Sequence, residues 1–400
     1  MPDRLRLCFL TRRWVAEIAP GGVAVWTQAL AAGLAARGHA VSVVTGASST
    51  PSTDIENGVA VHRIAPNRDA STPDLLAGAP AELAAFSIAA AAEVARIRAA
   101  RSLDLVSGPI SNLEPAACLA AGLVPTVVSL HTTRAVARDG ETPGHEESAA
   151  IAAETALLRA APLALANSRA IEADVRRLHP GALARADIAF VPHGLADLAA
   201  GVALNAGGDD RRRLLFVGRL ETRKGADVVL DALALLLPDR PELEADVIGD
   251  DDAAGPPVRA RFLERWAGAP WLARVRFWGP LPRARLPERY AAADVVLAPS
   301  RYESFGLAFA EAMMFAKPVI AARAGAAPEV IADGATGLLV PAGDAWSLAR
   351  AAAALLDDPA RARALGAAGR RRFETELTLE RMVERVEKVF GRWVAQKRSA

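Results

Sequence analysis

The chain has 400 residues, with 47 lysines and arginines against 46 aspartates and glutamates, so its formal net charge is +1. This length predicts two or three domains, each large enough to bury its own core. The balanced charge argues against a general attraction to nucleic acid.

Short apolar runs distinguish this chain from secreted and membrane-spanning proteins. The first run, 7–10, is followed by a threonine and two arginines, which is unlike a signal peptide. The longest uncharged run, 18–36, contains Pro-Gly-Gly and polar residues, so it is a poor spanning helix. Cys8 and Cys118 are expected to be buried thiols in a reducing compartment. We therefore expect a cytoplasmic protein, and basic clusters such as 370–372 leave peripheral contact with the inner membrane face as an alternative.

The beginning of the chain follows a strand–helix–strand pattern. Residues 5–11 predict a strand, 23–37 a helix with one apolar face, and 40–45 a second strand. Such a βαβ unit predicts a parallel sheet. The loop before the helix ends at Gly21 and Gly22 but lacks the full G-x-G-x-x-G fingerprint, so an ordinary tight turn explains it equally well.

Strands and alanine-rich helices continue to alternate through the first half. Strands are predicted at 59–64, 103–107, 125–130 and 163–166, and helices near 80–100, 112–122 and 146–160. His131 directly follows a strand, at the carboxyl end where open α/β sheets bind ligands, so it is a candidate binding residue with a structural role as the alternative. The next stretch, 132–147, is polar and glycine-containing and predicts a surface loop. His62 and His193 are interpreted as structural.

A change of pattern predicts the domain boundary. Residues 196–211 have no sustained period and include adjacent glycines and aspartates, which is typical of a linker. A second series of strands and helices follows, so we expect domains at 1–195 and 212–378. The last predicted helix, about 379–400, carries apolar residues at helical spacing that need a partner surface.

The loop 218–225 places two cations near a strand end. Arg219 directly follows a predicted strand, and Lys224 stands at the start of the next helix. The loop is not a P-loop, which requires a Gly-Lys-Ser/Thr order. Two cations at this sheet edge could stabilise a diphosphate leaving group as its charge develops. A solvated arginine and a helix-capping lysine are the alternative.

The stretch 294–340 contains the most specific pattern. A β-branched run closes at Pro299, and Gly306 then opens a helix. A helix start presents free N–H groups and a positive dipole end, which suit a phosphate. Glu303 and Glu311 flank this start, and eight residues of helix span roughly 12 Å. One carboxylate could bind a sugar and the other a ribose across a diphosphate; two solvated glutamates are the alternative.

The order of these elements resembles a known family. A strand, E-S-F-G-L at 303–307, Glu311, K-P-V-I at 317–320 and G-A-A-P-E-V-I at 325–331 is similar to the signature of retaining glycosyltransferases of family four. The resemblance implies an α/β protein of the GT-B fold, with two doubly wound Rossmann-like domains facing a cleft. The amino-terminal domain would bind the acceptor and the carboxy-terminal domain the donor. The last helix would pack back on the first domain.

The resemblance also assigns site residues. It implies catalytic roles for Glu303, His131, Arg219 and Lys224. It implies donor binding by Gly22, Arg219, Lys224, Leu281, Phe305, Gly306, Leu307 and Glu311. The two cations would bind the diphosphate, the histidine would face the transferred sugar, and Leu281 would frame the base. The family often has an acidic residue after this histidine, and Thr132 stands there instead.

The implied reaction is transfer of a hexose, with retention, from a nucleotide-diphosphate sugar to a hydroxyl acceptor. UDP-sugars are favoured and GDP-sugars come next; the acceptor would be a sugar, a lipid-linked compound or a small molecule. No nucleophile is evident, so a front-face mechanism assisted by the leaving group is implied. No metal or other cofactor is expected. A nucleotide-sugar epimerase of the same fold and a non-catalytic nucleotide-binding relative remain alternatives.

Overall fold

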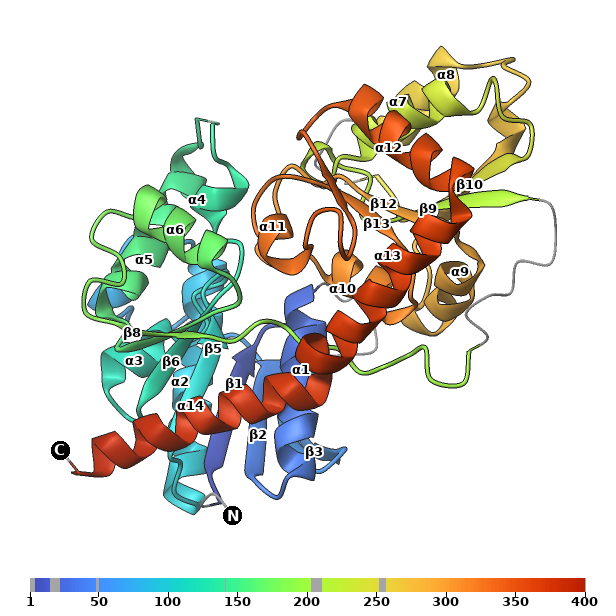
Figure 1. The fold of residues 1–400 in the computed structure, drawn as a ribbon. Coiled ribbons are helices and arrows are strands. Elements are labelled where there is room, and N and C mark those ends of the chain that lie inside the picture. The colour runs from blue at the N-terminus through green and yellow to red at the C-terminus, as the bar shows by residue number, and fades with distance from the viewer. Residues whose placement is uncertain are drawn as a thin grey trace. The chain divides into compact units, whose positions relative to one another are not determined.

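The computed structural model describes residues 4–14, 22–47, 50–140, 142–202, 211–251 and 257–399. The chain divides into two compact units (Figure 1). The first unit contains the chain up to Gly194 and again from Leu379, and the second contains Leu195–Thr378. The predicted turn residue Gly21 and the central part of the predicted linker, 203–210, lie outside the described residues.

An eight-stranded sheet forms the centre of the first unit, in the order β3-β4-β2-β1-β5-β6-β7-β8. The strands are β1 (Arg6–Thr11), β2 (Ala40–Gly46), β3 (Ser52–Glu56), β4 (Val59–Ile64), β5 (Leu105–Pro109), β6 (Thr126–Leu130), β7 (Leu163–Ala166) and β8 (Asp187–Phe190). Neighbouring strands pair in parallel except β3, which is antiparallel to β4. The chain order reverses between β1 and β5, so the topological switch point lies there.

Helices cover this sheet. They are α1 (Gly22–Ala36), α2 (Ala81–Ala100), α3 (Ala116–Ala121), α4 (Arg134–Ala137), α5 (His145–Ala160), α6 (Arg169–Leu178) and α14 (Leu379–Ser399). Ser168 caps α6 by accepting a hydrogen bond from Ile171 N at 3.1 Å. Cys8 and Cys118 are buried free thiols. Within the described part of the chain, no helix combines the length and apolar character needed to span a bilayer.

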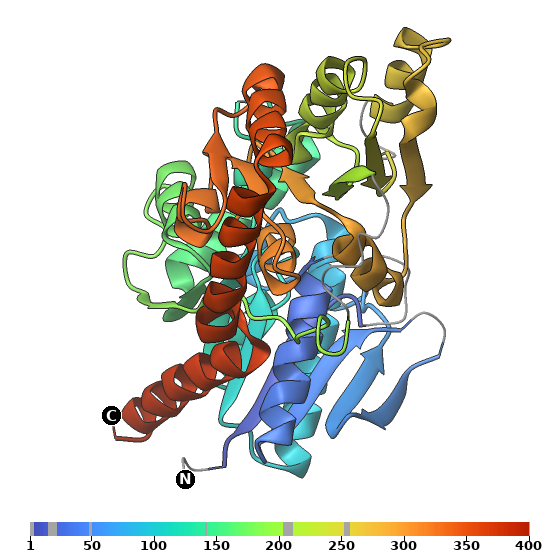
Figure 2. The same ribbon diagram turned by 45° about the vertical axis from the view of Figure 1, so that its right-hand side comes forward.

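Helix α14, the last element of the chain, packs on α1 in the first unit (Figures 1 and 2). Its apolar side chains Met382, Val386 and Phe390 share one core with Phe9 of β1 and Leu30 of α1. These α14 side chains recur every three or four residues, which places them on one helix face. Burial of that face supplies the hydrophobic free energy that holds the helix on this unit.

A buried carboxylate also fixes α14. Glu387 Oε2 accepts hydrogen bonds from Arg37 Nε at 3.0 Å and Nη2 at 2.7 Å. Glu387 Oε1 lies 2.9 Å from His39 Nε2. Because Leu5 N donates to His39 Nδ1 at 3.1 Å, the ring proton of the neutral tautomer sits on Nε2 and is donated to Glu387. Burial by itself raises the pKa of Glu387, but the bonds from Arg37 and His39 outweigh burial and hold it below its ordinary value.

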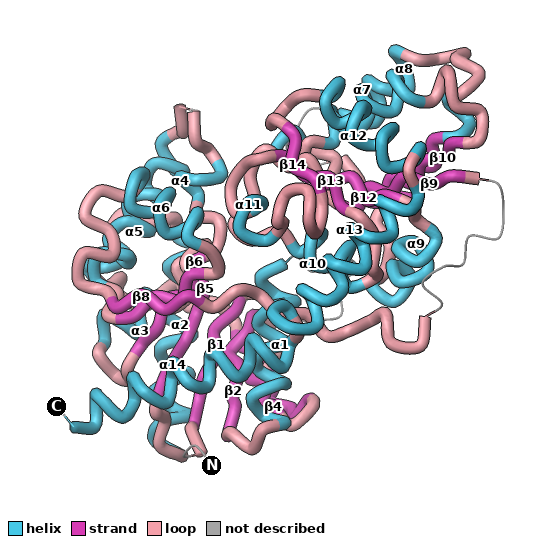
Figure 3. Tube along the Cα trace, in the orientation of Figure 1, coloured by secondary structure: helices cyan, strands magenta, loops and turns pink. Residues whose placement is uncertain are grey.

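A six-stranded parallel sheet forms the second unit, in the order β11-β10-β9-β12-β13-β14 (Figure 3). The strands are β9 (Arg212–Val217), β10 (Leu243–Ile248), β11 (Val275–Gly279), β12 (Val295–Ala298), β13 (Val319–Ala322) and β14 (Leu338–Val340). The helices are α7 (Ala226–Leu236), α8 (Val258–Arg265), α9 (Leu286–Ala292), α10 (Leu307–Met314), α11 (Ala327–Val330), α12 (Ala345–Asp357) and α13 (Pro359–Arg372). The chain order reverses between β9 and β12, which is this sheet's switch point.

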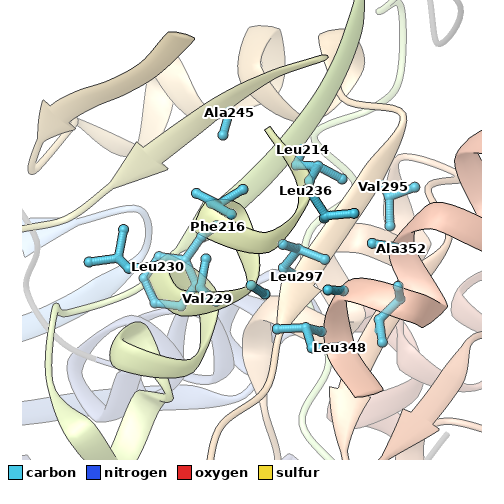
Figure 4. Packing of buried hydrophobic residues seen from close by; sticks show 14 of the residues in the cluster. Leu214, Phe216, Val229, Leu230, Leu236, Ala245, Val295, Leu297, Leu348 and Ala352 are labelled. Carbon is cyan, nitrogen blue, oxygen red and sulfur yellow. The ribbon is translucent and has the colours of Figure 1, made fainter. Parts of the chain in front are cut away.

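Two hydrophobic cores lie on the two faces of this sheet. Successive side chains of a strand point to opposite faces. Leu214 and Phe216 of β9 accordingly pack in a core with residues of α7 and α12, including Leu230 and Leu348 (Figure 4). Leu215 belongs to the other core, with α9 and α10. Helices cover both faces of the sheet, which makes the unit Rossmann-like. Apolar residues of α10 belong to the core on one of these faces.

One strand was not predicted from the sequence, and one sequence-based expectation was wrong. The strand β3 (Ser52–Glu56) was not predicted, because its side chains are mostly exposed and lack an apolar alternation. The stretch 132–147 is not wholly a loop, since α4 (Arg134–Ala137) lies inside it and α5 begins at His145. Thr133 caps α4 by accepting from Val136 N at 3.2 Å, which stabilises a helix too short to show a periodic pattern.

Candidate functional site

The loops that follow β9 and β12 meet at the carboxyl edge of the second sheet. Arg301 N donates to Arg223 O at 2.8 Å across the two loops. Gly225 has φ +69°, and a Cβ at this position would lie 2.2 Å from Pro299 O. Only glycine fits so close to the neighbouring backbone with this dihedral angle. The two predicted loops are therefore held together at the switch point, where such sheets bind ligands.

Lys224 and Glu303 form an ion pair between these loops. Lys224 Nζ lies 2.5 Å from Glu303 Oε1, and Ser300 Oγ donates to the same oxygen at 3.0 Å. The side chains are only 24% and 13% exposed, so both charges are partly desolvated. Two donors, one from the loop after β9 and one from the loop after β12, therefore hold the Glu303 carboxylate in place. Two residues predicted from different stretches of the sequence thus stand in direct contact.

Arg219 lies on the same loop as Lys224, and a carboxylate holds it there. Its Nη1 is 3.1 Å from Glu221 Oε2, and its side chain is 57% exposed. Arg223 Nη2 binds the other oxygen of Glu221 at 2.6 Å. Glu221 and Arg223 were not predicted from the sequence, although an acidic residue two positions after a candidate cation is a detectable signal. The loop therefore presents more positive than negative charge.

Helix α10 begins between the two predicted glutamates. Gly306 is its N-cap residue with φ +91°, and a Cβ there would lie 2.2 Å from the Phe309 ring. This glycine therefore allows the chain to turn into the helix. Phe305 is buried, and Leu307 is the first helical residue. The N–H groups of the first turn give this end of α10 the partial positive charge that attracts anions.

Glu311 lies on α10 and is held by residues from another segment. Tyr290 of α9 donates its hydroxyl proton to Glu311 Oε2 at 2.7 Å. Arg283 Nη1 stands 3.9 Å from Glu311 Oε1. Burial raises the pKa of Glu311, whereas Arg283, the Tyr290 hydrogen bond and Lys224 oppose that shift and favour the carboxylate. Tyr290 was missed in the sequence; its only signal is that it is one of two tyrosines in the chain.

His131 lies in the first unit, directly after β6. Its ring is buried, with the Trp26 ring centroid 5.0 Å away and the His193 ring stacked at 5.5 Å. Burial lowers the pKa of His131 to about 4, so the ring is neutral at physiological pH. Its Nε2 has no hydrogen-bond partner within the described ranges. A buried, neutral imidazole with an unused nitrogen can bind a hydroxyl group. His193, interpreted as structural, packs against it.

The predicted site residues fall into two groups. Glu303, Arg219, Lys224, Leu281, Phe305, Gly306, Leu307 and Glu311 belong to the second unit. Gly22, which opens α1 and is exposed, and His131 belong to the first unit. Leu281 follows β11 and packs on the core that contains Phe305. Among the residues that the structure describes, no cluster of histidine, cysteine, aspartate and glutamate could hold a metal ion.

Comparisons with known families match both halves of the chain. Residues 20–196 match the model described as Glycosyltransferase Family 4. Residues 205–372 match the model described as Glycosyl transferases group 1. The second match contains Lys224, Glu303 and Glu311, and the first contains Gly22 and His131.

Curated relatives and solved structures agree with these families. The chain is 34% identical to a D-inositol 3-phosphate glycosyltransferase of Kineococcus radiotolerans, covering 88% of this chain and 86% of the relative. It is 33% identical to the protein of that name from Xylanimonas cellulosilytica, covering 88% and 87%. The fold is similar to sucrose-phosphate synthase of Thermosynechococcus elongatus, with a TM-score of 0.78, 24% identity and coverage of 98% and 100%.

Proposed function

Because this chain belongs to the glycosyltransferases of family four, which have the GT-B fold, we propose that it transfers a sugar from a nucleotide-diphosphate sugar to a hydroxyl acceptor with retention of configuration. The observation that carries the donor class is the Lys224–Glu303 pair beside the start of α10, at the switch point of the second sheet. Binding of a diphosphate needs a cation and free amides, and binding of a sugar needs a carboxylate.

The diphosphate would bind to Lys224, Arg219 and the first amides of α10. As the glycosidic bond breaks, its electron pair passes to the departing phosphate oxygen, where negative charge grows. Fixed cations and helix amides aimed at that oxygen stabilise the transition state more than the ground state. Phe305, Gly306 and Leu307 would contribute through their backbone N–H groups, which requires no polar side chain.

The two glutamates would have separate roles. Glu303, fixed by Lys224 and Ser300, would accept hydrogen bonds from the transferred sugar and face its anomeric carbon as that carbon becomes positive. Glu311 would accept hydrogen bonds from the ribose, with Leu281 beside the base. Uridine is the first base to test and guanosine the second.

The acceptor would belong to the first unit, with Gly22 and His131. The neutral imidazole of His131, with its unused Nε2, suits recognition of a sugar hydroxyl. The acceptor hydroxyl would attack the face that the diphosphate leaves, and its proton would pass to the leaving phosphate oxygen. This exchange retains the configuration without an enzyme nucleophile. Since the two curated relatives are named for D-inositol 3-phosphate, an inositol phosphate is the first acceptor to assay.

A thermal-shift panel with UDP, GDP, ADP and TDP identifies the base, since a ligand that binds only the native state raises the melting temperature. Sugar transfer is then measured with the corresponding nucleotide sugars and inositol phosphate. Hydrolysis or transfer products with inverted configuration would contradict the retaining mechanism. If none of the four nucleotides raises the melting temperature, the donor assignment is contradicted.

Substitution of each glutamate tests its role. Glu311→Gln should weaken binding of the free nucleotide by roughly 1.5–3 kcal/mol, the cost of a lost charge-assisted hydrogen bond. Glu303→Gln should leave nucleotide affinity nearly unchanged and lower turnover. Glu264→Gln, an exposed glutamate on α8 of the same unit, is the matched control. Equal effects of the first two substitutions on nucleotide affinity would mean that their roles are assigned wrongly.

A further inference from the structure

Tyr290 has a rigidly fixed ring at the back of the proposed donor site. The residue lies on α9, and its ring is fully buried. It stacks on Phe315, the C-cap residue of α10, with ring centroids 5.2 Å apart and planes 4° apart. Stacking on one side and burial throughout leave the side chain no alternative rotamer of similar energy. The hydroxyl group therefore has a defined position.

The hydroxyl of Tyr290 binds one oxygen of Glu311. The O–H···O distance to Oε2 is 2.7 Å, which is a normal length for a hydrogen bond from a hydroxyl group. Burial, and then the adjacent Glu311, raise the pKa of Tyr290 well above its ordinary value, so the phenol keeps its proton and acts only as a donor in this pair. The bond fixes the rotation of the terminal carboxylate of Glu311.

The second oxygen of Glu311 has a different environment. Arg283 Nη1 lies 3.9 Å from Oε1, which is an ion-pair distance beyond hydrogen-bond length. The Glu311 side chain is 12% exposed, so it is largely buried but not sealed from the surface of the unit. A carboxylate has about four acceptor positions, and Tyr290 uses one of them. The carboxylate orientation that Tyr290 sets therefore determines the direction of the remaining acceptor positions of Glu311.

We propose that Tyr290 is a positioning residue that orients Glu311 toward both hydroxyls of a ribose and so makes the site select ribose over 2′-deoxyribose. This inference rests on the proposed role of Glu311. A ribose presents two adjacent hydroxyl donors, and an oriented carboxylate can accept from both. A 2′-deoxyribose leaves one acceptor of a largely buried carboxylate without its partner, which costs affinity. A carboxylate that can rotate loses this discrimination.

Tyr290→Phe tests the inference, because it keeps the ring and its stacking on Phe315 and removes only the hydroxyl. Calorimetry compares UDP with 2′-deoxy-UDP, or the matching guanosine pair if the thermal panel selects GDP. In the unchanged protein we expect the ribonucleotide to bind about tenfold more tightly. In Tyr290→Phe the affinity for the ribonucleotide should fall by about tenfold and that for the deoxynucleotide much less, so that the ratio approaches one.

Ser347→Ala is the matched control, since it removes a half-buried hydroxyl that donates a hydrogen bond to Asp344 at the start of α12 in the same unit. It should leave both affinities and their ratio unchanged. Equal weakening of the two nucleotides in Tyr290→Phe would indicate general damage and overturn the inference. An unchanged ratio would also overturn it. Melting temperatures of all variants report any loss of fold.

Glu311→Gln separates this inference from the proposed function. If Glu311→Gln binds the ribonucleotide normally, the ribose assignment fails, and the role of Tyr290 fails with it. If Glu311→Gln weakens binding but Tyr290→Phe does not, only the positioning role fails. If the ribose role of Glu311 and the positioning role of Tyr290 are both right, adding Tyr290→Phe to Glu311→Gln should cause little further loss of ribonucleotide affinity. The reason is that the Tyr290 hydroxyl acts through the Glu311 carboxylate.

Discussion

Replacement of Glu387 by alanine should loosen α14 from the first unit. The carboxylate is the common acceptor for two hydrogen bonds from Arg37 and one from His39. Alanine leaves the buried ring N–H of His39 without an acceptor, and the Arg37 guanidinium without its counter-charge. Both losses fall at the contact between α14 and the segment that follows α1.

The expected cost is about 2–3 kcal/mol. Removing one partner of a fully buried ion pair costs roughly 3–5 kcal/mol. Water can partly replace the lost contact, because the Arg37 side chain is 41% exposed while that of Glu387 is 8% exposed. For a unit of this size, each 1 kcal/mol shifts the melting temperature by roughly 2–4 °C. We therefore expect a fall of roughly 4–12 °C.

Thermal unfolding combined with hydrogen exchange measures the effect. Amides of α14 and α1 should exchange faster in Glu387→Ala, whereas those of α12 in the second unit should not change. The control is Glu384→Ala, on the same helix, whose pair with Arg381 is more exposed. If the two variants differ by less than about 0.5 kcal/mol, the reasoning is wrong.

The pH dependence supplies a second test of the same pair. Because the pKa of Glu387 is held below its ordinary value of 4.5, its ionised form stabilises the fold at neutral pH. This stabilisation is fully present above that value and is lost as the pH falls through the lower pKa of the folded state. The advantage of the unchanged protein over Glu387→Gln should therefore shrink in acid. An advantage that grows in acid would contradict the assignment.

Three further predictions concern the rest of the chain. Gly225→Ala combines a positive φ with a contact 2.2 Å from Pro299 O, so it should destabilise the second unit by about 1–3 kcal/mol and weaken nucleotide binding in thermal unfolding and calorimetry. Burial raises the pKa of Glu154 to about 8, so stability should decline as the pH rises from about 4.5 to 8 and Glu154→Gln should decline less in urea unfolding; parallel curves would contradict this. Sugar transfer should persist in EDTA, because Lys224, Arg219 and the α10 amides supply the positive charge; loss of activity that magnesium or manganese restores would refute it.

Local signals explain why much of the donor edge could be predicted. The β-branched run before Pro299 and the glycine that opens α10 are recognisable within a few residues. Parallel strands place their carboxyl ends at one edge, so Lys224 and Glu303 could be assigned to the same edge. Their direct contact depends on β9 lying beside β12, which joins residues 79 positions apart. That strand order has no local signal.

Contacts between helices explain what the sequence did not reveal. Tyr290 belongs to no recognisable motif in the sequence, and only the folded structure brings its hydroxyl on α9 to Glu311 on α10. The short helix α4 is also held by Glu154, whose Oε2 accepts a hydrogen bond from Arg134 N at 3.0 Å. This partner lies 20 residues later, beyond the reach of periodicity or capping patterns. Side-chain roles that depend on tertiary packing therefore cannot be predicted from local sequence patterns.

The position of α14 has a consequence for synthesis on the ribosome. The second unit is continuous from Leu195 to Thr378, whereas the first unit needs residues from both ends of the chain. During translation the surface of α1 that α14 later covers stays open while all of the second unit is made. At 5–20 residues per second this interval lasts roughly 10–40 s. The unit made first is therefore the one completed last, and the apolar surface of α1 that α14 covers is without its partner during that interval.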